Sequence, residues 1–368
     1  MRFLHTADWH IGKQLYGYSL EKEQIYAFDK LIEIAKSEDI DAIVVAGDIY
    51  NQGMASERSF KLFNKIMYKL NIDLGYPLLA ISGNHDSADR LGVGKEWFVS
   101  HKFYLSTSLD QVFNPICIKD TQFFLLPFFS LHDAKVYFND YSLNSLNEAY
   151  KKIFLKLYQL FDPKLYHVLV AHLFTSDKNI RNEEIGNLSL IPIKLFDIFD
   201  YVALGHIHNH KVMSSNLKVK YSGSLLKFNV SEANQTKGVY IVDTKQKNFK
   251  FVPITPLNDI YVLKGMFNNL YENPNQLPND SFVDFELTDS MPIEDLMNKL
   301  RNKYCHQRII RVNRINGIKN LSQINVNLNS IVQSPFSLVS NFFNDVTEKP
   351  MNDIQKGIIK QYFDKNNK

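Results

Sequence analysis

The sequence predicts an α/β protein, in which strands and helices alternate, with a small α+β domain and C-terminal helices after them. Three observations favour this fold class. Short apolar segments typical of buried strands alternate with segments whose apolar residues recur at helical spacing. Several of the strands end in Asp, Asn or His. Beyond about residue 255, Pro and polar residues interrupt the pattern, which indicates a domain boundary.

The first part of the chain predicts three strands joined by two helices. "RFLHTAD" (Arg2 to Asp8) is typical of a buried strand, and a helix is expected over about Leu20 to Glu38. "DAIVVAGD" (Asp41 to Asp48) predicts a second strand, followed by a helix over about Glu57 to Leu70 and a strand over Pro77 to Gly83. This order predicts parallel pairing, and such sheets bind ligands beyond the carboxyl ends of their strands.

Later segments continue the layer. "HVLVAH" (His167 to His172) and "DYVALGH" (Asp200 to His206) are apolar strands that end in His. We expect antiparallel strands to complete the layer in "KVKYSG", "GVYIVD" and "FKFVPI", at 218–223, 238–243 and 249–254.

A small α+β domain is expected after the boundary. It is indicated by "FVDFEL", a helix near Ile293 to Lys303, and "RIIRVNRI". The Asn- and Ser-rich segment 322–338 predicts a linker in part, and two short amphipathic helices around Pro350 are expected over about Phe336 to Phe363. The predicted division is therefore 1–255, 256–330 and 331–368.

Composition narrows the class of protein. The 368 residues are 45% hydrophobic and 22% charged, which is ordinary for globular domains. We expect a cytoplasmic protein, because no long apolar run or apolar signal sequence is present. Only Cys117 and Cys305 occur, which argues against a disulfide scaffold or a thiolate metal site, and we expect no role for either.

Charge is distributed unevenly along the chain. The net charge is +3, yet Leu296 to Lys368 holds 12 Lys and Arg against 4 Asp and Glu, or +8, which leaves −5 for the rest. The stretch Lys299 to Lys319 has seven basic residues and no acidic one. This pattern favours a polyanion partner for the second part, although a solvated basic face would look the same.

Polar residues stand at the ends of five apolar strands. Taken alone, any one of them is more simply a helix cap or a satisfied loop residue. Five coincidences at one edge of one sheet instead indicate a site, and Asp8/His10 and His206/His208 are i, i+2 pairs that point the same way in extended backbone. The residues that gather at this edge are Asp8, His10, Asp48, Asn84, His85, Asp86, His172, His206 and His208.

This donor set predicts a metal centre. Carboxylates would repel one another at this edge unless cations were bound between them. Carboxylate, amide and imidazole ligands without thiolate fit Mn²⁺ or another borderline divalent ion better than structural zinc. Seven ligands suit two ions that share Asp48 as a bridge. Two ions roughly 3.5–4 Å apart could clamp an in-line displacement at phosphorus.

The motifs "DWH", "GDIY", "GNHD", "AHL" and "GHIH", in this order, resemble those of the calcineurin-like metallophosphoesterases over roughly Met1 to Ile254. The resemblance implies a layered β-sandwich flanked by helices. "HTADWHIGK" and "YSGSLLKFNVSEANQTKGV" (Tyr221 to Val239) are similar to the nuclease subunits of a bacterial DNA-repair complex. That similarity implies a metallophosphoesterase nuclease domain, a DNA-capping domain over about 256–330, and C-terminal helices that hold an SbcC-like ABC-type coiled-coil ATPase.

Carried over by position, the resemblance also implies roles. One ion would be held by Asp8, His10, Asp48 and His208, and the other by Asp48, Asn84, His172 and His206. His85 would bind no metal and would help the leaving oxygen depart, while Asp86 would orient His85 or cap the next helix. We expect no such role for His5, His210, His101, His132, His167 or His306.

The activity implied is that of a Mn²⁺-dependent DNA nuclease, with Mg²⁺ or other divalent ions as alternatives. It would act as a 3′→5′ exonuclease on double strands and as an endonuclease on hairpins and single strands, in DNA repair, recombination and replication. The implied assembly is a homodimer within a heterotetramer near the nucleoid. Candidate DNA contacts are Lys13, Tyr16, Arg58 and Arg90, for which an interpretation without function is equally open.

Two other functions use the same fold. One is a phosphatase or a cyclic-nucleotide phosphodiesterase, but "GDIYNQG" lacks the Arg that protein phosphatases of this fold carry after the second motif. The other is a non-catalytic DNA-tethering subunit, which the full ligand set disfavours. At the C-terminus we expect docking on the ATPase, or else packing on the chain's own domains, by Phe342, Phe343, Ile354, Ile358, Ile359 and Phe363.

Overall fold

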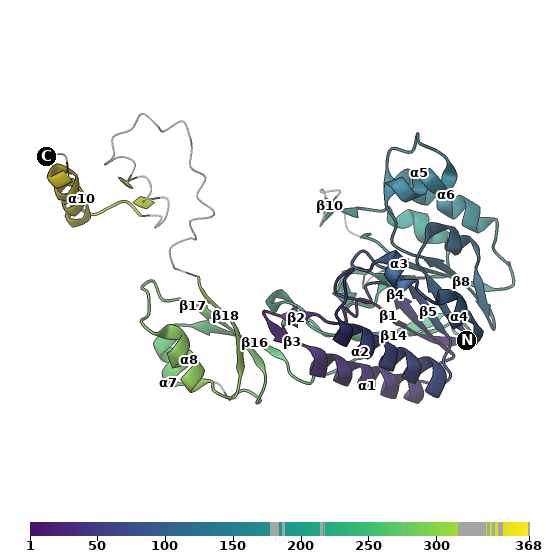
Figure 1. Ribbon diagram of the computed structural model, residues 1–368, viewed down its shortest axis with the longest axis horizontal. Coiled ribbons are helices and arrows are strands. Elements are labelled where there is room, and N and C mark those ends of the chain that lie inside the picture. The colour runs from purple at the N-terminus through teal and green to yellow at the C-terminus, as the bar shows by residue number, and fades with distance from the viewer. Residues whose placement is uncertain are drawn as a thin grey trace. The chain divides into compact units, whose positions relative to one another are not determined.

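The structure is a computed structural model. It divides into two compact units, Met1–Asp259 and Ile260–Lys368, which are described one at a time (Figure 1). The predicted further division at residue 331 stays a prediction. The residues described are 1–176, 184–185, 188–213, 216, 218–274, 276–315, 336, 339–340, 343–344 and 349–366.

The first unit contains a six-stranded sheet in the order β15-β14-β1-β4-β5-β6. β1, β4, β5 and β6 run parallel, which confirms the pairing expected from the alternation of strands and helices. β14 and β15 add antiparallel strands at one edge, as predicted for segments 238–243 and 249–254. The bounds are β1 Arg2–Thr6, β4 Ala42–Ala46, β5 Leu78–Ile81, β6 Phe103–Ser106, β14 Gly238–Asp243 and β15 Asn248–Pro253.

A second sheet has the order β13-β12-β9-β8-β7. The expectation that all five motif strands share one sheet is therefore wrong, because β9 and β12 belong to this one. The antiparallel prediction for 218–223 is also wrong, because β13 pairs parallel to β12. A turn of 3₁₀-helix, η5 (His210–Met213), lies on the return path between them. The bounds are β7 Ile116–Ile118, β8 Thr121–Leu126, β9 Tyr166–His172, β12 Tyr201–Gly205 and β13 Val219–Tyr221.

The two sheets pack face to face through a shared apolar core. Phe3 of β1 meets Phe123 of β8 and Tyr201 of β12 edge to face, with ring centroids 5.3 and 5.8 Å apart. Val44 and Val170 are completely buried in the same cluster. Strands buried on both faces read as continuous apolar runs, which is why "AIVVA" and "HVLVAH" were recognisable. The layered sandwich is thus confirmed.

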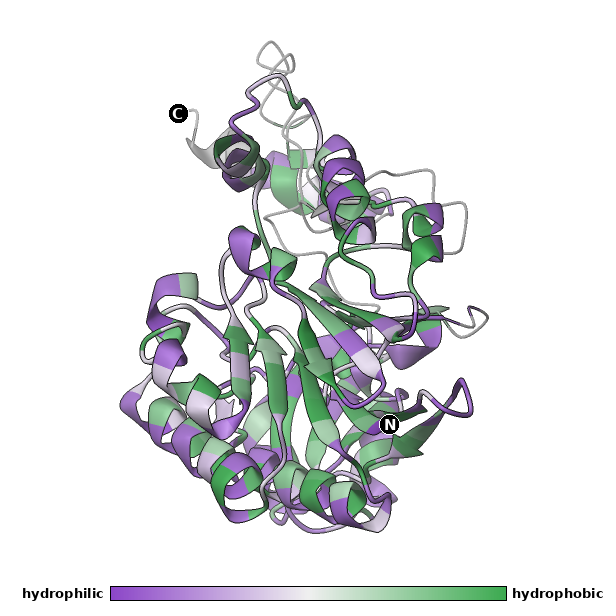
Figure 2. Cartoon of the chain, turned by 90° about the vertical axis from the view of Figure 1, so that its right-hand side faces the viewer, coloured by the Kyte–Doolittle hydropathy of each residue, from purple (hydrophilic) through white to green (hydrophobic). Residues whose placement is uncertain are grey.

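Helices cover the outer faces of the sandwich. α1 (Glu21–Ser37) and α2 (Glu57–Met67) lie together on one side, and α5 (Leu131–Phe138) and α6 (Leu146–Tyr158) lie on the other (Figure 1). The helix expected over 57–70 ends as α-helix at Met67 and continues as a π-helix, η1 (Tyr68–Asp73). Figure 2 shows hydrophobic strands inside and hydrophilic residues on the outer helices.

Short elements complete the first unit. They are β2 Gln14–Leu15, β3 Tyr18–Ser19, α3 Ala88–Leu91, α4 Lys95–Phe98, η2 Val99–His101, η3 Leu109–Phe113, β10 Glu184–Ile185, β11 Leu188–Ser189, η4 Ile193–Ile198 and η6 Val230–Glu232.

The second unit begins with a three-stranded parallel sheet in the order β16-β17-β18. The strands are β16 Ile260–Gly265, β17 Phe282–Leu287 and β18 Arg308–Arg314, and α7 (Phe267–Glu272) and α8 (Leu296–Lys303) connect them. β17, α8 and β18 match the predicted strand, helix and strand. The basic stretch runs through α8 and β18, and its last residues, 316–319, lie outside the described residues.

The last described element is α10 (Asp353–Asn366). It follows Pro350, as predicted, whereas most of the first predicted C-terminal helix, including Phe342, and most of the predicted linker lie outside the described residues. Of the predicted docking residues, Ile354 and Ile358 are 76% and 61% exposed. None of the helices in the described ranges has the length and apolar character needed to cross a membrane.

Candidate metal centre

The polar residues singled out from the sequence meet at the carboxyl ends of strands from both sheets. They follow β1, β4 and β5 of the first sheet and β9 and β12 of the second. The loops after these strands therefore converge at one end of the β-sandwich, where the carboxyl ends of strands from both sheets lie close together. The residues brought together are Asp8, His10, Asp48, Asn84, His85, His172, His206 and His208.

The backbone at this edge is strained. Asp8, His10 and Asp48 have φ of 51°, 42° and 51°, and His206 has φ of 98°, values that residues with a Cβ rarely adopt. Gly83 permits the close approach of two loops, because a Cβ there would lie 2.2 Å from Oδ1 of Asp48. Such strain persists only where the surrounding structure enforces it, and it is common at functional sites.

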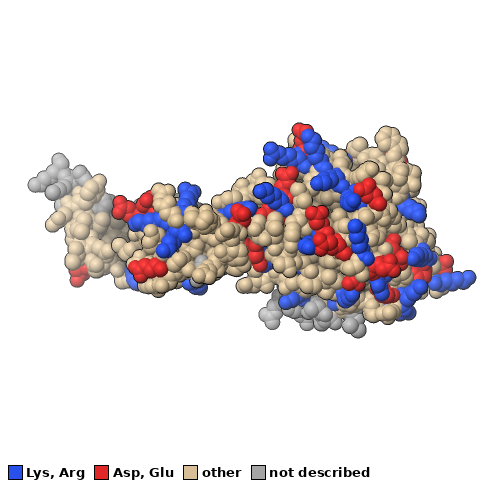
Figure 3. Space-filling view, turned by 90° about the horizontal axis from the view of Figure 1, so that it is seen from below, with Lys and Arg blue, Asp and Glu red and all other residues tan. Residues whose placement is uncertain are grey.

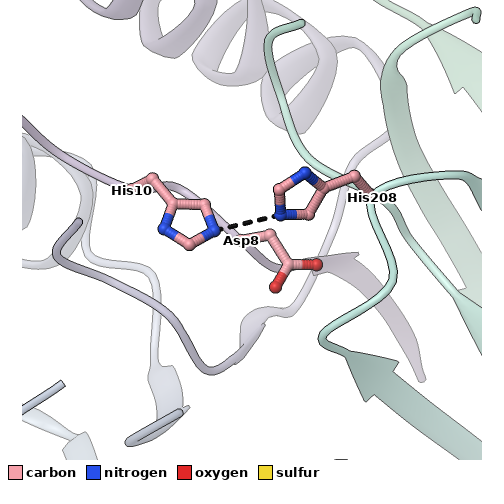
Figure 4. A group of neighbouring side chains, drawn as sticks. All are labelled: Asp8, His10 and His208. Carbon is pink, nitrogen blue, oxygen red and sulfur yellow. Dashed lines mark hydrogen bonds between the residues drawn. The ribbon is translucent and has the colours of Figure 1, made fainter. Parts of the chain in front are cut away.

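One group of candidate ligands consists of Asp8, His10 and His208, whose ligand atoms all lie within 4.8 Å of one another. Nε2 of His10 lies 3.1 Å from Nε2 of His208, and the carboxyl group of Asp8 lies beside them (Figure 4). Oδ1 of Asp8 accepts a hydrogen bond from the backbone N–H of His206. Its Oδ2 and Nδ1 of His10 are buried and have no hydrogen-bond partner among the residues that the structure describes.

The second group lies around Asp48. Oδ2 of Asp48 is 3.4 Å from Nε2 of His172 and 3.6 Å from Nε2 of His10, so this carboxylate stands between the two groups. Oδ1 of Asn84 is 3.0 Å from Nε2 of His172 and 3.2 Å from Nδ1 of His206. Asp8, Asp48 and His172 also form a ligand triplet within 4.8 Å, which means that Asp8 faces both groups.

Burial and mutual charge shift the pKa values of this cluster. Burial lowers the pKa of His10 to about 3 and that of His206 to about 4. Burial would also lower the pKa of His172, but the neighbouring Asp48 carboxylate raises it to about 9. The pKa of Asp8 is raised, chiefly by burial. Without a cation, the Asp8 and Asp48 carboxylates are therefore buried beside His10 and His206, whose lowered pKa values keep these two imidazoles neutral at pH 7.

These residues fit a divalent cation. Oδ2 of Asp8 is a buried carboxylate oxygen without a hydrogen-bond partner among the described residues, and such an atom is costly unless something else binds there. The donors are nitrogen and oxygen atoms only, which suits Mn²⁺, Mg²⁺ or a similar ion. In addition, the Nδ1–H of His172 can donate to the backbone oxygen of Ala46, 2.9 Å away, leaving its Nε2 free to bind a metal.

His85 stands beside the metal ligands rather than among them. Its side chain is 45% exposed, and Nε2 lies 4.0 Å from Oδ2 of Asp48. Nδ1 lies 3.1 Å from the backbone oxygen of Asn51, which orients the ring. The ring is thus accessible to a substrate that reaches the centre.

Asp86 lies next to His85 in sequence, but its hydrogen bonds go to backbone N–H groups of two loops. Its Oδ1 accepts from the backbone N–H of Tyr50, and its Oδ2 accepts from those of Ile49 and Gly83. The carboxylate therefore ties the loop after β4 to the loop after β5, while the Asn51 carbonyl orients His85. Burial and the Asp48 charge raise the pKa of Asp86 to about 6.

Two residues that sequence reasoning did not identify lie behind His208. Oε1 of Glu232 is 3.0 Å from Nδ1 of His208, and Nζ of Lys237 is 2.7 Å from Oε2 of Glu232. Burial would raise the pKa of Glu232, but the hydrogen bond to His208 and the charge of Lys237 lower it to about 2. Their segment was noted only for its family resemblance, and nothing in its local pattern places it beside His208.

The other histidines next to the motifs have structural contacts. His5 lies 3.0 Å from the Tyr201 hydroxyl and 3.2 Å from the backbone oxygen of Leu204. The ring of His210 stacks on Phe251 with centroids 3.7 Å apart.

The candidate DNA contacts lie near the centre in different settings. Lys13 and Arg58 line one cavity of about 140 Å³ between the first loop and α2. Tyr16 is exposed, and its hydroxyl is 3.4 Å from Oδ1 of Asn229. Arg90 donates to the backbone oxygen of Gly53. On the face shown in Figure 3, Lys and Arg are interspersed with Asp and Glu over the first unit.

Comparison with known proteins gives a family and a full-length relative. The family model described as calcineurin-like phosphoesterase matches residues 1–210. The chain is 31% identical over 369 residues to the D component of the nuclease SbcCD from Staphylococcus epidermidis, covering 98% of this chain and 97% of the relative.

Similar solved structures are more distant. One is a novel archaeal phosphodiesterase, with 16% identity, a TM-score of 0.32, and coverage of 69% of this chain and 100% of its own. Another is the protein TT1561 of Thermus thermophilus, with 13% identity, a TM-score of 0.43, and coverage of 69% and 99%.

Proposed function

The chain belongs to the calcineurin-like phosphoesterase family and is a homologue of the SbcD nuclease subunits, and from this premise we propose that it cleaves DNA with two Mn²⁺ ions. The observation that supports this most is the convergence of seven nitrogen- and oxygen-bearing residues from five strands. The buried Oδ2 of Asp8, which has no hydrogen-bond partner among the described residues, fits a cation, and two ions would supply Lewis acidity and an activated water for displacement at phosphorus.

The chain's own residues have distinct tasks in this proposal. Asp8, His10, Asp48 and His208 would hold one ion, and Asp48, Asn84, His172 and His206 the other. Because Asp48 lies between the groups and Asp8 faces both, loss of either carboxylate should disturb both ions.

His85 would act on the leaving group. With Nδ1 directed at the Asn51 carbonyl, Nε2 is the nitrogen that faces the centre. A nucleotide 3′ oxygen would leave as a poorly stabilised alkoxide unless it received a proton or a hydrogen bond there. Asp86 would keep the two loops that carry Asp48 and His85 in register.

The type of DNA cleavage is proposed from the resemblance of the motifs to those of SbcD nuclease subunits. We propose 3′→5′ exonuclease activity on duplex DNA and endonuclease activity on hairpins and single strands, in an SbcCD-type repair complex. The test is hydrolysis of labelled duplex DNA beside a chromogenic phosphomonoester, with Mn²⁺, with and without an SbcC-like ATPase. Faster cleavage of the monoester would favour the phosphatase alternative, and no cleavage of either would favour a tethering subunit.

The C-terminal helix supports the partner proposal. Ile354, Ile358 and Tyr362 of α10 are 76%, 61% and 64% exposed and recur every four residues, so they form one apolar stripe. We expect this stripe to bind the coiled-coil base of the ATPase. Ile354→Glu/Ile358→Glu should abolish co-purification, whereas Lys356→Glu on the same helix should not. A chain truncated after Pro335 that still co-purifies would exclude this surface.

A second copy of the chain is the other partner in the proposed heterotetramer. Val93, Trp97 and Val99 are 73%, 82% and 50% exposed in and around α4, which is unusual for large apolar side chains close together in sequence. We expect Trp97→Glu to convert a dimer to a monomer in light scattering, and Val136→Glu, at another exposed apolar residue, to leave the dimer intact. If the Trp97→Glu variant still forms a dimer, the interface does not include this surface.

A further inference from the structure

The segment from Ser224 to Lys237 supports one side of the metal centre. Glu232 within it is only 7% exposed, so its carboxylate has little access to water. Its Oε1 lies 3.0 Å from Nδ1 of His208, and its Oε2 accepts from Nζ of Lys237 at 2.7 Å and from the backbone N–H of Phe228 at 3.2 Å. A buried carboxylate with these partners has a fixed position and a neutralising charge beside it.

Lys237 fixes the backbone of the same histidine. Besides Glu232, its Nζ donates to the backbone oxygen of His208 at 3.0 Å and to Oγ of Ser224 at 2.9 Å. The Phe228 ring packs edge-on against the rings of His10 and His208, with centroids 5.3 and 5.6 Å apart. Both the ring and the main chain of His208 are therefore held from one segment.

His208 differs in this respect from the other imidazoles of the centre. Nδ1 of His172 faces the neutral carbonyl of Ala46, and Nδ1 of His206 faces the amide oxygen of Asn84. Nδ1 of His10 is buried and has no partner within the described ranges. Among these four described residues, a carboxylate stands at Nδ1 of His208 alone. A carboxylate behind a histidine selects the Nδ1–H tautomer, fixes the ring and makes Nε2 a stronger ligand.

We propose that Glu232, held by Lys237, is a positioning residue that keeps Nε2 of His208 directed at a divalent cation and sets the affinity of the Asp8–His10–His208 group for it. The inference rests on the proposed two-ion function. It assigns the motif "SEANQTKG" a task at the metal centre, namely to brace one ligand from behind without touching the ion.

The test uses the full chain stripped of metal, with three variants. Glu232→Gln keeps the shape but removes the charge. Glu232→Gln/Lys237→Met also removes the ammonium, so that no unpaired charge is left buried. Asp243→Asn is the matched control, because it removes a carboxylate that pairs with Arg2, 3.3 Å away, at the opposite edge of the same unit.

Two measurements separate positioning from general structural support. In ¹⁵N NMR of the ion-free histidines, we expect a single Nδ1–H tautomer for His208 in the wild type and control, and a mixture in both Glu232 variants. In Mn²⁺ titrations followed by electron paramagnetic resonance, we expect one class of ion to bind about 10–100-fold more weakly in those variants. The thermal unfolding midpoint of the ion-free double variant should stay within a few degrees of that of the ion-free wild type.

The outcomes are distinguishable. An unchanged tautomer and unchanged Mn²⁺ affinity in the folded double variant would overturn the role of Glu232. Equal weakening in Asp243→Asn would also overturn it, since the effect would then be a general loss of stability. Absence of Mn²⁺ binding to the wild type would instead remove the proposed function, and the tautomer of His208 would still decide what Glu232 does.

Discussion

The two ends of the β-sandwich, where the parallel strands begin and where they end, differ in whether their polar groups are paired. Each end is called an edge below. At the edge where the parallel strands begin, the amino group of Met1 meets Asp120 at 2.7 Å and Arg2 meets Asp243 at 3.3 Å. At the edge where they end, Oδ2 of Asp8 and Nδ1 of His10 are buried and have no hydrogen-bond partner in the part of the chain that the structure describes. The charged groups named at the first edge are therefore paired, whereas these two atoms at the second are not.

Backbone strain is not confined to the carboxyl edge. Asp8, His10, Asp48 and His206 have positive φ values there, but Asp39, Lys102 and Lys119, just before β4, β6 and β8 at the other edge, have them as well. The two edges therefore differ in the pairing of their polar groups, and unpaired groups are kept where function requires them. The comparison indicates that the carboxyl edge of the sandwich is suited to bind a divalent cation. It also predicts that equivalent substitutions at the two edges have different consequences.

The largest effect is expected for Asp48→Asn. This change removes the carboxylate that lies between the two groups of ligands, so both ions should bind poorly. Nuclease activity should fall by roughly 10⁴-fold or more, because the contribution of the metals is lost as a whole. The measurement is Mn²⁺ stoichiometry by elemental analysis together with the rate on duplex DNA.

Asp243→Asn at the opposite edge is the matched control for this change, and it should keep both metal content and rate. Full Mn²⁺ stoichiometry in Asp48→Asn would contradict the two-ion assignment.

A smaller loss of activity is expected for His85→Leu. Because His85 is not placed as a ligand, metal content and DNA affinity should stay close to wild type while the rate on DNA falls by about 10²–10⁴-fold. A nitrophenyl diester, whose leaving group needs little protonation, should lose less. All quantities are measured on one preparation.

His101→Leu, at an exposed histidine elsewhere in the first unit, serves as the control and should change nothing. If His85→Leu loses metal, the residue is a ligand. If both substrates suffer equally, the residue positions phosphate and does not protonate the leaving group.

The elements of the site were predictable because each motif follows an apolar strand. Asp48 after "AIVVA" and His172 at the end of "HVLVAH" follow from the rule that ligands bind beyond the carboxyl ends of parallel strands, but this rule does not bring the strand ends of two different sheets together. The number of sheets was not predictable in this way, since periodicity does not say which strands pair. Thus β9, β12 and β13 formed a second sheet, and β13 ran parallel to β12.

The residues that support His208 could not be predicted from the local sequence pattern. Glu232 and Lys237 lie more than twenty residues from His208 in a segment without regular periodicity, and only the folded chain brings them together. Asp86 shows the converse, since its position next to His85 in sequence suggested a role in orienting His85 or capping the next helix and did not indicate its bonds to three backbone N–H groups. At a site built from loops, the residues next to a functional side chain in sequence are often not the ones that hold it in place.

A third prediction concerns stability in the absence of metal. The pKa of Asp8 is raised in the folded state, so its charge at pH 7 opposes folding. Asp8→Asn should therefore make the ion-free protein more stable by about 1–3 kcal/mol. Asp120→Asn at the other edge should make it less stable by about 0.2–1 kcal/mol, because the lost ion pair is partly exposed. Urea denaturation with a chelator measures both.

Added Mn²⁺ should reverse the order of stability of these proteins. It should raise the free energy of unfolding of the wild type and of Asp120→Asn but not that of Asp8→Asn. A destabilised ion-free Asp8→Asn would mean that the carboxyl edge does not carry the unsatisfied charge inferred from its geometry.

The smallest effect is expected at His5, which lies between the two edges. Burial lowers its pKa to about 3, as for His10, yet both its nitrogens have partners. A histidine with a lowered pKa contributes stability that is complete above about pH 6.5 and is lost as the pH falls from there toward 3. Between pH 7 and pH 5 the wild type should lose about 1–2 kcal/mol that His5→Gln does not lose. Urea denaturation at both pH values measures this difference, and at pH 7 the variant should bind Mn²⁺ as the wild type does. Weaker Mn²⁺ binding in the folded variant would show that His5 contributes to the metal centre although both of its ring nitrogens have partners.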